Sequence, residues 1–455
     1  MLKKNDLIPL EIQAVTSSEG SGVGRYEGMV VFVPGAAPGD RLTVRVVKVL
    51  SSYCYGIIQE ILSPGPGRIQ PACPVCRRCG GCSLQHLSYQ EEVRIKGQWI
   101  SDALTRLGGI SLPLEQMLPS PLSSGYRNKA QYPIGRGPEG VFCGFYAPRS
   151  HNIIPCGGDC LLQPPFFGEI ARAVCQYIEE SGKEPYDETT HRGLFRHLYL
   201  RWGEATGQVM VCLVVNGPGI PQPHLLVSRV LAACPNSSIA SILLNINTGR
   251  TNVILGRETK VLFGEPYIRD VLAGVEVEIS PLSFYQVNHQ GAELLYRQAA
   301  ELAALSPGET LLDLYCGAGT IGLSMAKDAK ELIGVEIVES AVWDAQKNAA
   351  RSGVQNARFL CADAGKAAAQ LEAEGLHPSV VILDPPRKGC DEATLSAVVR
   401  MAPERIVMVS CNPATLARDL RRLARDGYEV RTVRGVDMFP RTVHVESVAL
   451  LTRHP

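Results

Sequence analysis

The sequence predicts a multidomain chain with a small N-terminal β-barrel, an α+β middle part and a C-terminal α/β domain built on a parallel sheet. Three observations lead to this prediction. A chain of 455 residues is longer than one hydrophobic core usually serves. Short strand-like runs separated by glycine-containing turns fill its beginning. From about residue 280 onward, apolar runs typical of buried strands alternate with helical patterns, which indicates a parallel sheet.

Composition narrows the classes of function. The chain carries 45 basic and 45 acidic residues, so any contact with nucleic acid has to come from a local basic surface. No long apolar run follows Met1, and none elsewhere is long enough to span a membrane. We therefore expect a soluble cytoplasmic protein without membrane contact. In that compartment, its fifteen cysteines favour thiolate chemistry or metal binding over disulfides.

The pattern of strand-like runs and turns in residues 1–62 predicts the barrel. Strand-like runs occupy Leu10–Val15, Met29–Val33, Arg41–Val49 and Tyr55–Leu62. Gly20, Gly22 and Gly24 are interpreted as turn residues between them. An open five-stranded, OB-like barrel of this size commonly holds single-stranded nucleic acid, and a barrel without a ligand is the alternative.

A cysteine-rich run follows the barrel. It reads Cys-Pro-Val-Cys-Arg-Arg-Cys-Gly-Gly-Cys and contains Cys73, Cys76, Cys79 and Cys82. Ligation by thiolates alone suits zinc or an iron–sulfur cluster, and the spacing fits both. Such a site needs four ligands. The run supplies all four, or one comes from a second cysteine pair at Cys156 and Cys160.

The middle part, residues 63–279, mixes helical and strand patterns. Ser88–Arg106 has the apolar periodicity of a helix. Strand-like runs follow at Lys129–Ile134, Leu198–Trp202, Val209–Val215 and Ile239–Ile246. The stretch Tyr126-Arg-Asn-Lys129 combines cations with an aromatic ring, which suits contact with phosphate and a base; a solvated loop is the alternative.

Residues 280–455 predict a Rossmann-like domain with a ligand site at one edge. The first strand, Thr310–Tyr315, runs into a loop containing Gly317 and Gly319, whose backbone N–H groups are able to approach a ligand closely. Glu336 ends the second strand, at the spacing typical of a carboxylate that binds ribose. Asp363 and Asp384 follow the next two strands. Ligands of open α/β sheets bind at the carboxyl ends of the strands, where these side chains gather.

Cys411 stands between the fifth strand, Arg405–Ser410, and a helix, Pro413–Arg425, with Asn412 as its N-cap. The helix N-terminus favours negative charge, so we expect the thiol, ordinarily with a pKa of about 8.5, to shift towards thiolate. A small buried core residue is the alternative. If the last strand, Val445–Leu451, runs antiparallel, Glu446 faces Cys411.

Taken together, these motifs resemble a known family. The ones that carry the resemblance are Asp313-Leu-Tyr315 before Gly317-Ala-Gly319, Asp384-Pro-Pro-Arg387, Ser410-Cys-Asn-Pro413, His444-Val-Glu446 and Ser283-Phe-Tyr-Gln-Val-Asn288. They look like the RNA uracil-C5 methyltransferase family. Near the N-terminus, Gly22-Val-Gly-Arg25 and Pro38-Gly-Asp40 resemble the RNA-binding TRAM domain. The cysteine pattern behind such a domain resembles the branch of the family that modifies large-subunit (23S) ribosomal RNA.

The resemblance implies an activity and roles for individual residues. It implies methylation of uracil C5 in RNA, with Cys411 as the nucleophile and Glu446 as the base. The implied contacts with S-adenosylmethionine are Gln286, Tyr315, Thr320, Glu336, Asp363 and Asp384. A [4Fe–4S] cluster is implied on Cys73, Cys79, Cys82 and Cys160, with zinc as the weaker alternative. Cys76 is an additional thiol in the motif, so Cys76 and Cys156 remain candidates for the fourth ligand.

Other functions stay open at this point. The same reaction on tRNA is one alternative, and a non-catalytic RNA-binding iron–sulfur protein is another. Amino-methyltransferases use a loop similar to Asp384-Pro-Pro-Arg387 but need no thiol, so Cys411 and Glu446 argue against them. Radical methylthiotransferases combine cysteine clusters with TRAM domains in a different order and spacing.

Overall fold

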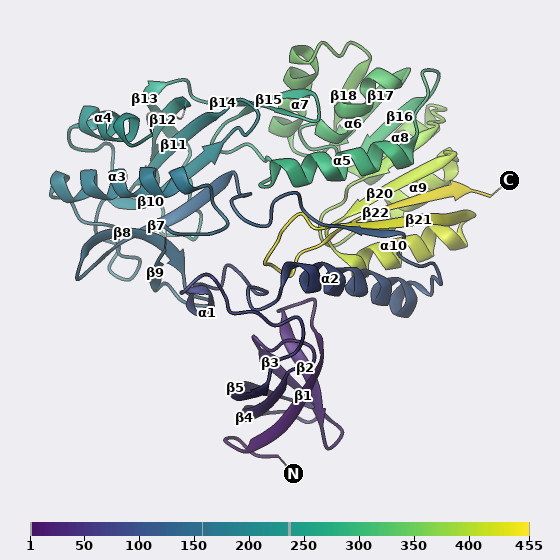
Figure 1. Ribbon diagram of the computed structural model, residues 1–455. Helices are drawn as coiled ribbons and strands as arrows, with labels where there is room; N and C mark the ends of the chain where they lie inside the picture. The colour runs from purple at the N-terminus through teal and green to yellow at the C-terminus, as the bar shows by residue number, and fades with distance from the viewer. Residues whose placement is uncertain (1, 157, 235–237, 455) are drawn as a thin grey trace.

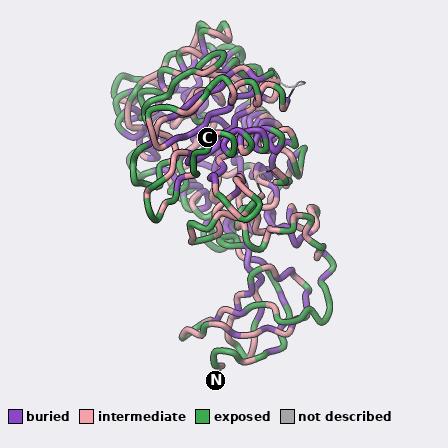
Figure 2. Tube along the Cα trace, turned by 90° about the vertical axis from the view of Figure 1, so that its left-hand side faces the viewer, coloured by how far each residue is buried: buried purple, intermediate pink, exposed green. Residues whose placement is uncertain are grey.

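The computed structural model describes residues 2–156, 158–234 and 238–454. Figure 1 shows three parts: the N-terminal barrel at the bottom, a middle lobe at the upper left and a C-terminal lobe at the upper right. Figure 2 shows the barrel standing out below the two lobes, whose interiors are buried. Among the residues that the structure describes, no helix has both the length and the apolar character needed to cross a membrane.

The barrel is closed, not open as expected. Its strands are β1 (Leu7–Val15), β2 (Ser21–Tyr26), β3 (Met29–Pro34), β4 (Arg41–Val49) and β5 (Tyr53–Ser63), in the order β1-β2-β3-β5-β4. Strand β2 was missed because Gly22 and Gly24 were interpreted as turn residues. A Cβ at Gly24 would lie 2.5 Å from the carbonyl oxygen of Glu11 in β1, so close strand packing requires glycine there.

The middle lobe is a seven-stranded sheet covered by two helices. Its strands, in the order β13-β12-β11-β10-β7-β8-β9, are β7 (Lys129–Gly137), β8 (Gly140–Tyr146), β9 (Ile153–Pro155), β10 (Phe195–Trp202), β11 (Gln208–Val215), β12 (Ser238–Ile246) and β13 (Glu258–Gly264). The four expected strands are confirmed as β7, β10, β11 and β12. Helices α3 (Pro165–Ser181) and α4 (Pro223–Ala233) pack on this sheet through one apolar core.

The C-terminal lobe is an eight-stranded sheet in the order β18-β17-β16-β19-β20-β22-β21-β6. Its strands are β16 (Thr310–Leu314), β17 (Glu331–Glu336), β18 (Ala357–Cys361), β19 (Val380–Leu383), β20 (Arg405–Ser410), β21 (Tyr428–Val436) and β22 (Glu446–Arg453), with β6 (Gln116–Leu118) from earlier in the chain. Strands β16 to β20 are parallel, as expected from the sequence. Strand β22 runs antiparallel to β20, which is the condition under which Glu446 faces Cys411. The ribbon β14 (Ile268–Leu272) and β15 (Val275–Ile279) leads into the lobe.

Helices cover both faces of this sheet because neighbouring strand residues point to opposite sides. Leu311 belongs to the core under α5 (His289–Ala303), α6 (Thr320–Met325) and α7 (Glu339–Arg351). Leu312 belongs to the core under α8 (Ala364–Ala373), α9 (Glu392–Met401) and α10 (Pro413–Arg425). The carboxyl ends of the parallel strands remain uncovered at one edge, where open α/β sheets bind ligands.

A segment that precedes the middle lobe in sequence packs on the C-terminal lobe. Helix α2 (Tyr89–Ala103) contributes Ile100 to the apolar core that also contains α10. The short π-helix that follows it, η1 (Leu104–Gly108), contributes Leu104 to the same core. Strand β6 pairs with β21 in parallel and extends the sheet. Helix α2, η1 and strand β6 therefore pack with the C-terminal lobe although they precede the middle lobe in sequence.

The barrel is joined to the C-terminal lobe by a small contact. The Trp99 indole N–H in α2 donates to the carbonyl oxygen of Val15 in β1 at 2.8 Å. The backbone N–H of Ser83 donates to the carbonyl oxygen of Arg441 at 2.9 Å. The short helix α1 (Cys76–Cys79) lies between the barrel and the middle lobe (Figure 1), which puts the cysteine-rich run at the junction of all three parts.

Candidate active site

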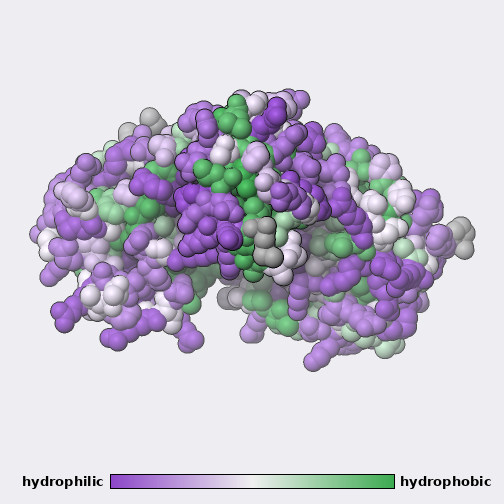
Figure 3. Space-filling model, turned by 90° about the horizontal axis from the view of Figure 1, so that it is seen from below, coloured by the Kyte–Doolittle hydropathy of each residue, from purple (hydrophilic) through white to green (hydrophobic). Residues whose placement is uncertain are grey.

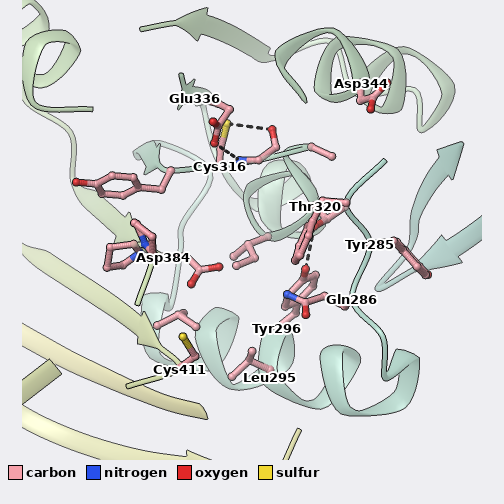
Figure 4. A pocket seen from close by; sticks show the side chains of 18 of the residues that line it. Tyr285, Gln286, Leu295, Tyr296, Cys316, Thr320, Glu336, Asp344, Asp384 and Cys411 are labelled. Carbon is pink, nitrogen blue, oxygen red and sulfur yellow. Dashed lines mark hydrogen bonds between the residues drawn. The ribbon is translucent and has the colours of Figure 1, made fainter. Parts of the chain in front are cut away.

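A cavity of about 880 Å³ opens at the carboxyl ends of the parallel strands. All of the catalytic and cofactor residues expected from the sequence line it: Gln286, Tyr315, Thr320, Glu336, Asp363, Asp384, Cys411 and Glu446. Figure 4 shows Asp384 between Glu336 and Cys411, with Gln286 and Tyr296 on the opposite wall. A cavity of this volume is large enough for a cofactor-sized molecule.

The glycine loop is held in a strained, tight conformation. Tyr315, Gly317 and Gly319 have φ angles of 65°, 56° and 77°, in the left-handed region that a tyrosine rarely adopts. Below the loop, a carboxylate oxygen of Asp313 accepts a hydrogen bond from the backbone N–H of Gly322 at 3.0 Å, which fixes the start of α6. A Cβ at Gly322 would lie 2.7 Å from that same oxygen, so only glycine fits. This packing turns the loop backbone towards the cavity.

Two carboxylates at the strand ends are oriented by backbone groups. One oxygen of Glu336 accepts from the N–H of Gly317 at 3.1 Å, and the other accepts from Ile337 and Val338, each at 2.9 Å. Asp363 caps α8 by accepting from the N–H of Lys366 at 3.2 Å. Both side chains are thereby preorganised at the cavity wall.

The interior of the cavity is unfavourable for negative charge. Burial raises the pKa of Asp384 to about 7. Burial, with Asp384 as the next cause, raises the pKa of Asp313 to about 8. On the opposite wall, the Tyr296 hydroxyl lies 2.9 Å from the hydroxyl of Thr320. Near neutral pH the carboxyl of Asp384 therefore exists in both protonation states and is able to donate or to accept a hydrogen bond.

The segment that carries Gln286 is anchored at both sides. The side-chain amide of Asn128 donates to the carbonyl oxygen of Gln286 at 2.9 Å. Asn288 caps α5, accepting from the N–H of Gly291 at 2.9 Å. Tyr285 donates to Asp270 at 2.7 Å, which holds the segment against the ribbon of β14 and β15.

Cys411 lies at the N-terminus of α10, as expected. Asn412 is the N-cap, accepting from the N–H of Ala414 at 3.1 Å, and Pro413 occupies the first turn. The expectation of a lowered thiol pKa is wrong. Burial, followed by the charge of Glu446, raises the pKa of Cys411, while Arg387 acts in the opposite direction. Desolvation and a nearby carboxylate outweigh the helix N-terminus.

Glu446 starts β22 and is 8% exposed. Burial and the charge of Asp384 raise its pKa well above the ordinary value, and Arg387 partly offsets them. Arg387 is also a structural link, because its carbonyl oxygen accepts from the Asn412 side-chain amide at 3.1 Å and from the Thr415 hydroxyl at 3.3 Å. One cation thus faces both the thiol and the carboxyl.

Further residues line the cavity besides the expected catalytic and cofactor residues. Arg127 and Lys129 line the cavity, so the solvated-loop alternative for this stretch is wrong. Burial, then Arg201 and Arg127, lower the pKa of Lys129 to about 8. His444 also lines the cavity, and its place two residues before Glu446 was the available signal. Phe439 lines it without any local sequence signal.

The cysteine-rich run meets the second cysteine pair. An interaction with the Cys156 thiol lowers the pKa of Cys79 to about 6. Cys160 is electrostatically coupled to Cys79 and to Cys82, whereas Cys76 interacts with Cys73 in its own run. Both members of the second pair therefore approach the run.

The residue types in and around the cysteine-rich run suit a group bound by thiolates. Within the described ranges, no three His, Cys, Asp or Glu side chains are arranged to hold a metal ion. Gly80 has a φ of 69°, and a Cβ at Gly81 would lie 3.5 Å from the Cys79 sulfur, so the backbone there is close to the thiols and not covered by side chains. Thiolates with adjacent glycines are compatible with zinc and with an iron–sulfur cluster.

The parallel sheet with its glycine loop, oriented carboxylates and thiol–carboxyl pair defines a methyltransferase of the α/β class. Residues 244–454 match the family described as tRNA (Uracil-5-)-methyltransferase, and residues 3–58 match the TRAM domain. The chain is 44% identical, over 99% of its length and 98% of the relative's, to an uncharacterised RNA methyltransferase of Halalkalibacterium halodurans. It is 41% identical, over 99% and 97%, to one of Clostridium tetani. The chain belongs to the RNA uracil-5 methyltransferase family.

A solved structure covers the whole fold. It is the crystal structure of Pyrococcus abyssi tRNA (uracil-54, C5)-methyltransferase in complex with S-adenosyl-L-homocysteine. The similarity has a TM-score of 0.78 and 28% sequence identity, and it covers 98% of this chain and 100% of that one. The arrangement of barrel, middle lobe and C-terminal lobe is thus shared with an enzyme that acts on RNA.

Proposed function

We propose that this protein transfers a methyl group from S-adenosylmethionine to carbon 5 of a uracil in 23S ribosomal RNA. The observation that carries the proposal is the position of Cys411 beside Glu446, at one end of a cavity whose other end is formed by Glu336 and the glycine loop. The Pyrococcus abyssi neighbour, which holds S-adenosyl-L-homocysteine, supports the choice of cofactor.

The residues at the Glu336 end suit the cofactor. Glu336 would accept from the ribose hydroxyls of the cofactor, as carboxylates at this position of a dinucleotide fold do. The loop from Tyr315 to Thr320, with Gln286 on the opposite wall, would hold its amino-acid part. Asp363 and Asp384 would add polar contacts. When bound, S-adenosylmethionine would supply an electrophilic methyl group and would leave as S-adenosyl-L-homocysteine.

The residues at the Cys411 end supply the activation that uracil needs. Carbon 5 of uracil is too weak a nucleophile to take a methyl group unaided. The Cys411 thiolate adds to carbon 6, forming a carbon–sulfur bond and an enolate whose carbon 5 is nucleophilic. After carbon 5 has gained the methyl group, Glu446 accepts the proton from that carbon, and the electron pair left behind expels the thiolate. Uracil leaves as 5-methyluracil, and Cys411 is free again.

Arg387 influences the ionisation of both reacting side chains, Cys411 and Glu446. The raised pKa values of Cys411 and Glu446 oppose the two ionised forms that the reaction uses. Arg387 lowers both, so it favours the thiolate for addition and the carboxylate for proton removal. Asp384, as a protonated donor or an ionised acceptor, is suited to the polar edge of uracil as well as to the cofactor.

The substrate uridine has to leave its stack to reach this pair. Enzymes that modify a base inside nucleic acid flip it into a pocket or use an unpaired base. Arg127 and Lys129, in the cavity wall, are placed to hold the phosphates of an extruded nucleotide. The Arg127 side chain has a buried Nε without a hydrogen-bond partner among the described residues, which a phosphate oxygen would satisfy.

We also propose a [4Fe–4S] cluster on Cys73, Cys79, Cys82 and Cys160. The supporting observation is the approach of the second cysteine pair to Cys79 and Cys82. Cys156 is the alternative fourth ligand. The run lies where barrel, middle lobe and C-terminal lobe meet, so a cluster would join the three parts, and no chemical step passes through it.

The choice of RNA rests on two different similarities. The order of TRAM domain and cysteine motif favours 23S ribosomal RNA. A second candidate is tRNA, because the solved structure with a TM-score of 0.78 is a tRNA (uracil-54, C5)-methyltransferase. The deciding experiment maps 5-methyluridine in 23S RNA and in tRNA from cells with and without this chain. If 5-methyluridine is lost only from 23S RNA, the proposal is supported. If it is lost only from tRNA, the substrate is tRNA and not 23S RNA.

A transfer assay tests the chemistry itself. Purified protein is incubated with total RNA and methyl-labelled S-adenosylmethionine, and the RNA is digested to nucleosides. Label in 5-methyluridine supports the proposed reaction. RNA that is bound but gains no label would leave a non-catalytic RNA-binding protein as the better description.

A further inference from the structure

Three aromatic side chains lie on the outer face of the barrel. Strands β3 and β5 pair in parallel, with Phe32 opposite Tyr55. Because side chains alternate along a strand, Val31 and Cys54 point into the core with 0% exposure, and Phe32, Tyr53 and Tyr55 point outward. These three rings are half-buried by one another and stand outside the apolar core of the barrel.

The rings form one continuous surface. The centroid of Phe32 lies 5.6 Å from that of Tyr53 and 5.7 Å from that of Tyr55, and the two tyrosines are 5.7 Å apart. Tyr53 meets Phe32 and Tyr55 edge-on, at 80° and 83°, and the rings of Phe32 and Tyr55 are tilted by 38° to each other. The closed barrel does not need these residues for its core, so their packing leaves a rigid aromatic surface on the outside.

Cations surround this aromatic surface. Arg149, from the turn after β8, lies 3.6 Å from Glu19, with the two side chains 91% and 58% exposed. Burial, Tyr53 and Glu19 raise the pKa of Tyr55 and Arg149 lowers it, so Tyr55 is within electrostatic reach of both charged groups. Next to Arg149, Pro148 contacts Gly80 at the end of α1, where Arg77 and Arg78 are exposed.

The turn between β1 and β2 lies near the C-terminal lobe. Gly20 follows Glu19, and a Cβ there would lie 3.2 Å from the Cγ1 of Val443. Val443 directly precedes His444, which lines the cavity. The turn therefore approaches Tyr55 through Glu19 and the residue next to the cavity wall through Gly20. Seen from below in Figure 3, the molecule shows groups of hydrophobic side chains on a largely hydrophilic surface.

We propose that Phe32, Tyr53 and Tyr55 form a stacking platform for unpaired bases of the substrate RNA next to the target nucleotide. Arg149 and the arginines of α1 contact the phosphates of the same strand. Open aromatic faces beside exposed cations are the combination that binds single-stranded nucleic acid, since every base has a face to stack. The inference rests on the proposed function, and it names the surface that receives the RNA outside the cavity.

Paired substitutions test the platform. The double variant Tyr53→Ala/Tyr55→Ala removes two ring faces, and Tyr53→Phe/Tyr55→Phe keeps them without the hydroxyls. Tyr267→Ala is the matched control, because Tyr267 is a partly buried surface tyrosine with Arg269 over its ring, 5.6 Å away, and it does not line the cavity. Binding of a fluorescein-labelled single-stranded RNA of mixed sequence is measured by anisotropy for each protein.

The expected pattern is specific to stacking. The alanine pair should weaken RNA binding at least fivefold, the loss expected from one or more stacked bases, and the phenylalanine pair and Tyr267→Ala should stay within twofold of the unaltered protein. In methylation assays the alanine pair should raise the KM for RNA and leave kcat at saturating RNA unchanged. Arg149→Gln should reduce the salt dependence of binding by about one phosphate contact.

The failure of the platform is distinguishable from the failure of the proposed function. Unchanged RNA affinity in the alanine pair, with S-adenosylmethionine binding and thermal unfolding both unaltered, would overturn the platform even if methylation proceeds normally. An equal loss in the phenylalanine pair would also overturn it, because hydroxyl contacts and not ring faces would then be responsible. If the unaltered protein methylates no RNA, the proposed function fails, and the anisotropy measurement still decides whether the platform binds RNA.

Discussion

Cys411 and Glu446 lie side by side at one end of an antiparallel strand pair, because Ser410 in β20 is paired with Ser447 in β22. The two side chains come from segments that are separated by helix α10 and strand β21. Each raises the electrostatic cost of the other's ionisation, as the raised pKa of Cys411 reflects. A thiol and a carboxyl held in this way suit a reaction that uses them one after the other.

The first prediction separates their two roles. Cys411→Ala should bind RNA and cofactor yet form neither product nor covalent complex, because no bond to carbon 6 is made. Glu446→Gln keeps the shape of the side chain but cannot accept the carbon-5 proton, so RNA should remain attached through Cys411 with the methyl group already transferred. The measurement is a denaturation-resistant protein–RNA band that carries label from the cofactor methyl group.

The double variant Cys411→Ala/Glu446→Gln is the control, and it should lose the band. Near-normal turnover by Glu446→Gln would remove Glu446 as the base. A trapped adduct without the methyl group would place its action before methyl transfer.

The second prediction concerns pH. The raised pKa of Glu446 keeps its carboxyl protonated at pH values where an ordinary glutamate is ionised. A base must be deprotonated to act, so turnover should rise as pH increases through this raised pKa. Arg387 lowers the pKa of Glu446 and of Cys411, and Arg387→Gln should move the rising limb of the pH–rate profile to higher pH.

Arg422→Gln is the matched control, since Arg422 lies on α10 away from the cavity and pairs with Asp426 and Glu392. Its profile should coincide with that of the unaltered protein. If the pH–rate profile of Arg387→Gln also coincides with that of the unaltered protein, Arg387 does not set the pKa values of Cys411 and Glu446.

The third prediction tests the cofactor end of the cavity. Glu336→Ala removes a carboxylate that backbone N–H groups hold in place, so the affinity for S-adenosylmethionine should fall by about 1.5–3 kcal/mol. Isothermal calorimetry measures the change. Glu339→Ala, on the exposed first turn of α7, should leave the affinity unaltered. An unaltered affinity in Glu336→Ala would exclude it as a cofactor contact.

The fourth prediction addresses the cysteines. Protein purified without oxygen should be brown and contain iron and sulfide. Cys160→Ser should lose or destabilise the cluster, and Cys76→Ser should keep it, because Cys160 interacts with Cys79 and Cys82 whereas Cys76 interacts with Cys73. Metal analysis and the visible absorption spectrum report the result. Stoichiometric zinc without iron would refute the cluster, and loss in Cys156→Ser but not in Cys160→Ser would reassign the fourth ligand.

The fifth prediction concerns stability at the junction of α2 and the segment before β22. The Lys96 ammonium is fully buried, 2.8 Å from Glu92 and 2.7 Å from Asp437. Lys96→Met leaves Asp437 without its cation and Glu92 with only Arg441, 3.5 Å away, so it should lower the free energy of unfolding by about 3–5 kcal/mol. Chemical denaturation measures it. Arg94→Met, which breaks an exposed pair with Glu91 on the same helix, should cost at most about 1 kcal/mol.

Local patterns in the sequence determined much of the C-terminal lobe. The start of α10 at Asn412 and Pro413 could be predicted because a cap and a first-turn proline act within one helical turn. The strand ends that carry Glu336, Asp363 and Asp384 were predictable because parallel strands have long apolar runs and a shared rim. The direction of the last strand was only a condition at the level of sequence. The structure meets this condition, because β22 runs antiparallel to β20 and brings Glu446 to Cys411.

Tertiary structure alone decided the features that depend on distant parts of the chain. Gly24 lies in a strand and not in a turn because β1 leaves no room for a Cβ. The pKa of Cys411 is raised because burial and Glu446, which no local pattern measures, outweigh the helix N-terminus beside it. Strand β6 joins the C-terminal sheet, and Arg127 enters the cavity, through contacts across more than a hundred residues. Sequence encodes short-range geometry directly, whereas desolvation and long-range packing exist only once the chain has folded.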